Sequence, residues 1–207
     1  MALNFARNGY AVILNGRNKK NLAAAKKEIG KEGVRCEVCE ADLATAKGLE
    51  KAYRVIRSEN ISVFVNNAGL HCPYIPFEQV TDGQIDVMIR INLVAALKLT
   101  RRIYEKFLKR SSGTIININS MCGLEGHKLR TIYSASKWGL RGFAECLRLE
   151  SAGKGIRILD VYPTRIMTIP AYTHGMETGA VAEKIFNVFK RTNSVRLVID
   201  DRKQAKK

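Results

Sequence analysis

TIININSMCGLEGHKLRTIYSASK, residues 114–137, is the stretch from which the fold can be inferred. It begins with isoleucines that alternate with asparagines, a pattern that predicts a buried strand over Thr114–Asn119. A loop with two glycines follows, and a proline-free segment from Tyr133 to about Ala152 predicts a helix. The stretch therefore predicts a strand, a loop and a helix in succession, with Ser120 at the end of the strand.

Tyr133 and Lys137 are four residues apart, so on a helix their side chains lie on one face. A tyrosine hydroxyl, with a pKa near 10, exchanges protons poorly at neutral pH. An ammonium at about 4 Å, with an effective dielectric near 20, would favour the phenolate by about 4 kcal/mol, or roughly three pK units. We therefore expect Tyr133 to exchange a proton with a bound oxygen, which Ser120 would hold by a hydrogen bond.

Four motifs in this order resemble those of the short-chain dehydrogenase/reductase family. They are Asn66-Asn67-Ala68-Gly69, the single Asn92, Ser120, and Tyr133-x-x-x-Lys137. Each motif alone is weak, but their shared order and spacing are specific, and the resemblance extends from about Leu3 to about Ile199. It implies a Rossmann-like α/β fold and an NADP(H)-dependent oxidoreductase that interconverts a carbonyl and an alcohol by hydride transfer. It also implies catalytic roles for Asn92, Ser120, Tyr133 and Lys137.

Apolar runs and amphipathic segments alternate along the chain. Strands are predicted at 11–15, 35–40, 62–65, 114–119, 157–161 and 195–199, and helices at 3–8, 21–29, 49–57, 84–109, 133–152 and 181–190. This alternation predicts a doubly wound parallel sheet with helices on both faces, in one domain over residues 1–207. Ligands of such sheets bind at the carboxyl ends of the strands, so we expect Asp42, Asn66, Ser120 and Pro163 to face one cleft.

The residue after the first predicted strand favours NADP(H) over NAD. Arg17 stands where the NAD-binding pattern would place an acidic residue, and a guanidinium can pair with a 2′-phosphate. A surface arginine in a turn is the alternative. The resemblance adds Asp42 beside the adenine, with a helix N-cap as the alternative, and Asn66 and Ala68 beside the cofactor, with a plain turn as the alternative. It further implies cofactor contacts for Tyr133, Lys137, Ile166 and Thr168, and for Asn92 a proton relay or, equally, a buried structural amide.

The start of the chain departs from the family pattern, which opens with a strand and a Thr-Gly-x-x-x-Gly-x-Gly loop that cradles the pyrophosphate. Neither feature is present, and the first residues resemble the end of the helix that follows that loop. We expect the two strands that would flank the absent one to be left unpaired. The chain is interpreted as N-terminally incomplete, through truncation or a misassigned start, or as a relative that has lost tight cofactor binding. Further on, the segment 169–179 is short, which suggests an open substrate site.

Composition restricts the partners and the compartment. The net charge is +16, with 35 basic and 19 acidic residues, and we interpret it as solvated helix faces because a nucleic-acid partner would rest on the sign alone. No run approaches the roughly 20 apolar residues of a membrane span, and no signal segment is present, which predicts a cytoplasmic protein away from membranes. The odd number of cysteines, Cys36, Cys39, Cys72, Cys122 and Cys146, suits a reducing compartment.

Metal binding is not expected. In the Cys36-x-x-Cys39 sequence, a strand would place the two thiols on opposite faces, and no histidine pair has ligand spacing. The expected partners are a small carbonyl or alcohol substrate, whose identity the sequence leaves open, and further copies of the chain. A homodimer or homotetramer could form through the long helices 84–109 and 133–152, where Ala135, Gly139 and Gly142 would allow close packing. A non-catalytic or truncated relative that acts through protein association is the alternative.

Overall fold

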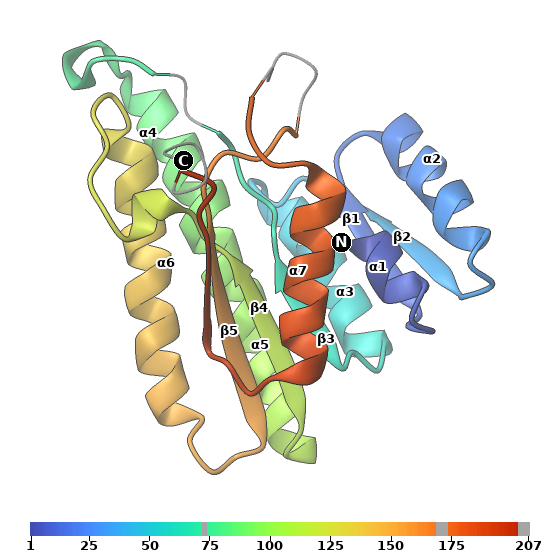
Figure 1. Ribbon diagram of the computed structural model, residues 1–207. Helices are drawn as coiled ribbons and strands as arrows, with labels where there is room; N and C mark the ends of the chain where they lie inside the picture. The colour runs from blue at the N-terminus through green and yellow to red at the C-terminus, as the bar shows by residue number, and fades with distance from the viewer. Residues whose placement is uncertain (72–73, 169–173, 203–207) are drawn as a thin grey trace.

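The computed structural model describes residues 1–71, 74–168 and 174–202 (Figure 1). The described residues do not include Cys72, the first five residues of the short segment 169–179, or residues 203–207. The strands are β1 (Val12–Gly16), β2 (Cys36–Glu40), β3 (Val63–Asn66), β4 (Gly113–Ile118), β5 (Ile156–Pro163) and β6 (Arg196–Ile199). The helices are α1 (Ala2–Ala6), α2 (Lys19–Gly30), α3 (Ala46–Ser58), α4 (Asp82–Ile89), α5 (Ala96–Arg110), α6 (Thr131–Glu150) and α7 (Thr178–Arg191). The predicted alternation of strands and helices is confirmed.

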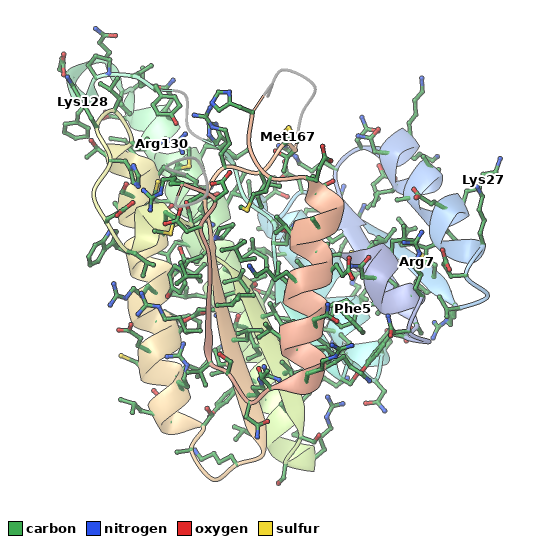
Figure 2. The ribbon with its side chains drawn as sticks, in the orientation of Figure 1. Phe5, Arg7, Lys27, Lys128, Arg130 and Met167 are labelled. Carbon is green, nitrogen blue, oxygen red and sulfur yellow. The ribbon has the colours of Figure 1, made fainter. Side chains whose placement is uncertain are left out.

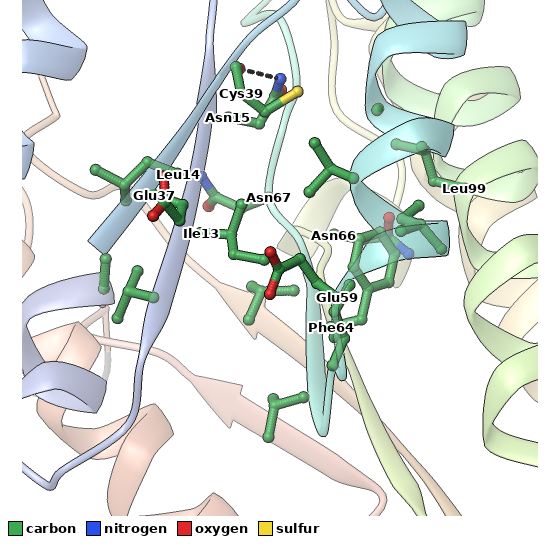
Figure 3. A pocket seen from close by; sticks show the side chains of 18 of the residues that line it. Ile13, Leu14, Asn15, Glu37, Cys39, Glu59, Phe64, Asn66, Asn67 and Leu99 are labelled. Atoms are coloured by element: carbon green, nitrogen blue, oxygen red, sulfur yellow. Dashed lines mark hydrogen bonds between the residues drawn. The ribbon is translucent and has the colours of Figure 1, made fainter. Parts of the chain in front are cut away.

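The strands form two parallel sheets. One has the order β1-β2 and the other the order β3-β4-β5-β6. Among the described residues, β1 and β3 each have a single strand partner, and residues of both line a cavity of about 530 Å³ (Figure 3). The expectation that two strands would each lack a partner is therefore confirmed. We call this cavity, with β1 on one wall and β3 on the other, the interstrand cleft.

Helices cover both faces of the sheets, as a doubly wound fold requires. Ile115 of β4 packs in a core cluster with residues of α3, α5 and α6, whereas Ile116 packs in a second cluster with residues of α1 and α7. Neighbouring residues of a strand point to opposite faces, so the isoleucine run serves two cores. In Figure 1, α7 crosses in front of the strands while α5 runs behind them.

Besides the packing of β2 against α3, two groups of contacts join the β1-β2 sheet to the rest of the molecule. Phe5 of α1 packs edge-on against Tyr10 and Phe186, with ring centroids 5.3 and 5.0 Å away, and Figure 2 shows it beside α7. Also at the cleft, both terminal guanidinium nitrogens of Arg35 donate to the Glu59 carboxylate at 3.0 and 2.8 Å. The interstrand cleft is thus bridged by an aromatic cluster and by a bidentate ion pair.

The two cysteines of β2 lie on opposite faces, as predicted. Cys36 packs with Ala6 and Ile29, whereas Cys39 belongs to the core cluster that contains Leu43. Both thiols are free and buried. No group of three or more side chains that could ligate a metal occurs among the described residues, and no helix there is long and apolar enough to span a membrane.

Candidate functional site

The end of β4 is tied to the first turns of α6. Lys137 Nζ donates to the carbonyl oxygen of Ile118 at 2.9 Å, and Asn119 Nδ2 donates to the carbonyl oxygen of Lys137 at 3.2 Å. Gly123 lies between them, where an added Cβ would come within 2.5 Å of Asn119 Oδ1, so only glycine allows this close approach. The strand, the loop and the helix predicted from residues 114–137 therefore meet at one place.

Lys137 is a buried cation with unused hydrogen-bond donors. Its exposed fraction is 7%, its Nζ lies 5.6 Å from the centroid of the Tyr133 ring, and burial lowers its pKa to about 8. An ammonium carries three N–H donors, but among the described residues only the carbonyl oxygen of Ile118 accepts a hydrogen bond from it. Buried donors require acceptors, so oxygen atoms of a bound molecule could satisfy the other two.

Ser120 caps a short 3₁₀ turn, Met121–Gly123, that packs against α6. Its Oγ accepts from the backbone N–H of Cys122 at 3.2 Å. Its hydroxyl hydrogen has no acceptor within hydrogen-bond distance among the described residues, so Ser120 can still donate to a substrate oxygen.

Asn92 lies in a π-helical turn, Arg90–Ala95, between α4 and α5. The long helix predicted around 84–109 is present, because residues 82–110 are helical throughout, but the π-helical turn within it was not predicted. The buried Asn92 amide binds both backbone groups of Leu70, accepting from its N–H at 2.6 Å and donating to its carbonyl oxygen at 3.0 Å. The π-turn thus aims Asn92 at the loop after β3, in keeping with the structural role that was one of two expected for it.

The predicted cofactor residues at the ends of β2 and β3 differ in how they face the site. Asn66 points into the protein, where its Nδ2 donates to Thr100 and to Asn117 at 2.8 and 2.9 Å. Asp42 accepts from the backbone N–H of Ala44 at 3.0 Å. The N-cap of α3 is Thr45, so the alternative of Asp42 as that cap is wrong.

The other predicted cofactor residues are more open. Arg17 is exposed and directly follows β1, and Ala68 is exposed at the rim of the interstrand cleft. Ile166 pairs with Met176 in an isolated parallel bridge, and the backbone N–H of exposed Thr168 donates to the Ile166 carbonyl oxygen at 2.9 Å. Because all strands of each sheet are parallel, the residues that follow β3, β4 and β5 share the carboxyl edge of one sheet.

Four side chains near Tyr133 escaped the sequence analysis: His71, Tyr74, Arg130 and Arg165. The Arg130 guanidinium lies 4.1 Å from the Tyr74 ring centroid and 5.7 Å from that of Tyr133, and it contacts His71 Nε2 at 3.1 Å. Arg165 Nη2 donates to the Tyr74 hydroxyl at 3.3 Å. The spacing of Arg130, three residues before Tyr133, was a usable signal, because it predicts the same helix face.

The small residues of α6 have different environments. An added Cβ on Gly139 would come within 2.8 Å of Leu93, so this glycine serves packing within the chain. Gly142 has open space around it and Ala135 is exposed. Of the residues expected at a subunit contact, these two remain accessible.

Comparison with known proteins gives consistent results. The family model for short chain dehydrogenases matches residues 1–173. A very-long-chain 3-oxoacyl-CoA reductase from Anas platyrhynchos is 34% identical over 172 residues, which cover 81% of this chain and 55% of that protein. An NADP-dependent 3-hydroxy acid dehydrogenase from Salmonella typhi is 29% identical over 165 residues, which cover 79% of this chain and 65% of that protein. The chain thus spans somewhat over half the length of these relatives.

Solved structures show the same fold. A short-chain dehydrogenase from Sphingobium yanoikuyae in complex with NADPH superposes with a TM-score of 0.87 at 26% identity, covering 95% of this chain and 81% of that one. A bulky-bulky ketone specific alcohol dehydrogenase from Comamonas testosteroni gives a TM-score of 0.88 at 26% identity, covering 95% and 79%.

Proposed function

Since this chain belongs to the short-chain dehydrogenase family, we propose that it is an NADP(H)-dependent oxidoreductase that interconverts a carbonyl and an alcohol. The observation that carries the proposal is the buried Lys137 beside Tyr133, tied to the strand end that bears Ser120. Burying an ammonium that has a single acceptor costs free energy, and a structural role rarely offsets that cost. A site that transfers a proton beside a bound nucleotide explains the burial better.

The cofactor would supply and accept the hydride, and several side chains of this protein would hold it. Lys137 and Tyr133 would bind the nicotinamide ribose, and exposed Arg17 would pair with the 2′-phosphate. Asp42 would lie at the adenine, and the backbone at Asn66 and Ala68 would border the cofactor, with Ile166 and Thr168 near the nicotinamide. The relative described as NADP-dependent and the neighbour solved with NADPH support the phosphorylated form.

At the reacting carbonyl, two hydroxyls would act on one oxygen. Ser120 would donate its free hydroxyl hydrogen and hold the oxygen in place. Tyr133 would give its phenolic proton to that oxygen during reduction and take it back during oxidation. Asn92 would have a positioning role, because its hydrogen bonds to Leu70 and Ser136 hold the loop after β3 beside the first turns of α6.

The proton-transfer role is tested by Tyr133→Phe. We expect kcat with NADPH and a carbonyl substrate to fall about 10²- to 10⁴-fold, the usual contribution of a general acid. Tyr53→Phe, the same chemical change on α3 beside Arg102, should leave kcat unchanged. Turnover retained in Tyr133→Phe would remove the proposed role.

The cofactor preference is tested by titrating NADPH and NADH calorimetrically into Arg17→Ser. Loss of a charge-assisted phosphate contact should weaken NADPH binding about 10- to 100-fold and leave NADH unaffected. Lys27→Ser, at the opposite end of α2 from Arg17, removes the same charge and should change neither affinity (Figure 2). If NADPH binding were weakened equally in Arg17→Ser and Lys27→Ser, the affinity would depend on the net charge of the protein and not on a contact made by Arg17.

The interstrand cleft favours a second candidate, a non-catalytic relative that acts through protein association, as a homodimer or homotetramer or with another protein. The cleft borders Asn67 and Ala68, so a nucleotide bound there would have an open wall on one side. The same titration separates the two candidates. Binding of neither nucleotide by folded protein would favour the non-catalytic one, and a monomer in sedimentation would exclude self-association.

A further inference from the structure

Close to Tyr133, the described side chains include a positively charged group that contains no carboxylate. Arg130 and Arg165 both contact Tyr74, and each also contacts an imidazole, His71 for Arg130 and His174 for Arg165. Neither arginine forms an ion pair with any described acidic residue. Many other arginines of this protein form ion pairs with a glutamate or an aspartate, as Arg148 does with Asp160.

The neighbours of the two arginines do not neutralise them. Burial lowers the pKa of His71, and the charges of Arg130 and Arg165 lower it further, so its imidazole is neutral at pH 7. Although burial acts to raise it, the pKa of Tyr74 is lowered by hydrogen bonds from Arg165 and Arg130. Two guanidinium groups in contact with one tyrosine repel each other, which costs free energy unless an anion joins them.

The backbone adds to this positive charge. Arg130 is the N-cap residue of α6, a helix of 20 residues, and no side chain caps its first N–H groups. The positive end of the helix dipole therefore lies at the backbone of Arg130. Figure 2 shows Arg130 at the same end of the molecule as Met167, two residues after Arg165 in the loop after β5.

We propose that Arg130 and Arg165, held together by Tyr74, bind a carboxylate of the substrate, so that the reacting carbonyl belongs to a small oxo acid. The inference rests on the proposed function, since it assigns the substrate class to the same site. Its geometry favours a short substrate, because the Arg130 guanidinium lies only 5.7 Å from the centroid of the Tyr133 ring that carries the hydroxyl. A carboxylate bound by Arg130 would thus be separated from the carbonyl at the Tyr133 hydroxyl by few bonds. Arginine suits this task because its planar donors match both oxygens of a carboxylate.

The test compares acetoacetate with its methyl ester, which keeps the carbonyl and removes the charge. We expect the wild type to reduce the acid with the higher kcat/KM. Arg130→Gln and Arg165→Gln should each lower the acid-to-ester ratio of kcat/KM about 10- to 100-fold, and Arg130→Lys, which keeps the charge, should lower it less. Arg101→Gln removes an equally charged side chain that pairs with Glu105 on α5, and it should leave the ratio unchanged. The inference would be overturned if Arg130→Gln and Arg165→Gln both kept the acid-to-ester ratio of kcat/KM at the wild-type value.

A binding measurement separates failure of the inference from failure of the proposed function. Titration calorimetry with acetoacetate and its ester does not depend on turnover. If no carbonyl compound is reduced but acetoacetate binds, and binding is lost in Arg130→Gln and at high salt, the anion site stands and the oxidoreductase proposal fails. If carbonyls are reduced but acid and ester bind alike, the oxidoreductase proposal stands and the anion site is wrong.

Discussion

At the scale of single residues, Lys137 shows how a site can cost stability. Its pKa is lowered from 10.5 to about 8 because burial removes water from the ammonium. The folded protein therefore binds this proton more weakly than the unfolded chain. Below pH 8 both states are protonated and the full cost applies. Between pH 8 and 10.5 the folded state releases its proton first, so the cost disappears as pH rises.

We predict that Lys137→Met is more stable than the wild type at pH 7, by up to about 3 kcal/mol, the equivalent of the pKa difference. Urea unfolding at pH 7 and at pH 9.5 should show the advantage shrinking at the higher pH. Lys98→Met, on the exposed face of α5, serves as the control and should give a small difference that is the same at both pH values. A variant that is less stable than the wild type at pH 7 would show that the Ile118 hydrogen bond outweighs the burial cost.

The residue scale also shows what the sequence could predict of the site. The sequence predicted from local spacing that Tyr133 and Lys137 share a helix face, and the Lys137 ammonium lies 5.6 Å from the Tyr133 ring centroid. The turn that Ser120 caps packs against the same helix. The inward direction of Asn66 could not be predicted, since it depends on register between strands. Asn66 is opposite Asn117 and Asn117 is opposite Asp160, and their side chains form a hydrogen-bonded row across the sheet. Only pairing of strands distant in sequence reveals that row.

At the scale of elements, the π-helical turn at Arg90–Ala95 is the main departure from expectation. The apolar residues of the segment 84–109 continue through it with helical spacing, so its sequence gives no sign of the change from α-helical to π-helical hydrogen bonding. The cause is distant in sequence, because Asn92 reaches the backbone of Leu70, and Gly69 approaches it closely enough that an added Cβ would lie 3.2 Å from Asn92 Oδ1. A long-range contact of this kind overrides the local pattern.

This contact predicts a clear loss of stability for Asn92→Ala. The change leaves the partly buried N–H and carbonyl of Leu70 without their partner, which should cost about 1–3 kcal/mol of stability. Urea unfolding measures the loss, and Asn193→Ala, at an exposed position, should cost less than about 0.5 kcal/mol. A small effect of Asn92→Ala would mean that water replaces the amide, and Asn92 would then be better explained by the proton relay.

At the scale of the whole molecule, the split sheet sets the order in which parts of the protein open. A two-stranded sheet alone is marginal, so β1 and β2 depend on helices and on the bridges across the interstrand cleft. The amides of β1 and β3 that face the cleft have no strand partner among the described residues, whereas β4 is paired on both sides. Amide exchange in such a structure is governed by local opening rather than by global unfolding.

We therefore predict that hydrogen exchange followed by mass spectrometry will show faster exchange in residues 10–40 than in β4 and β5. Phe5→Ala should widen the difference, because Phe5 is buried in the aromatic cluster with Tyr10 and Phe186 that joins the two parts. Loss of a buried phenylalanine costs about 3–5 kcal/mol, and most of it should fall on the β1-β2 sheet. Phe77→Ala, at an exposed position in the loop after β3, should leave both regions unchanged. Equal exchange in residues 10–40 and in β4, or a uniform increase in Phe5→Ala, would show that the two sheets open as one unit despite the cleft.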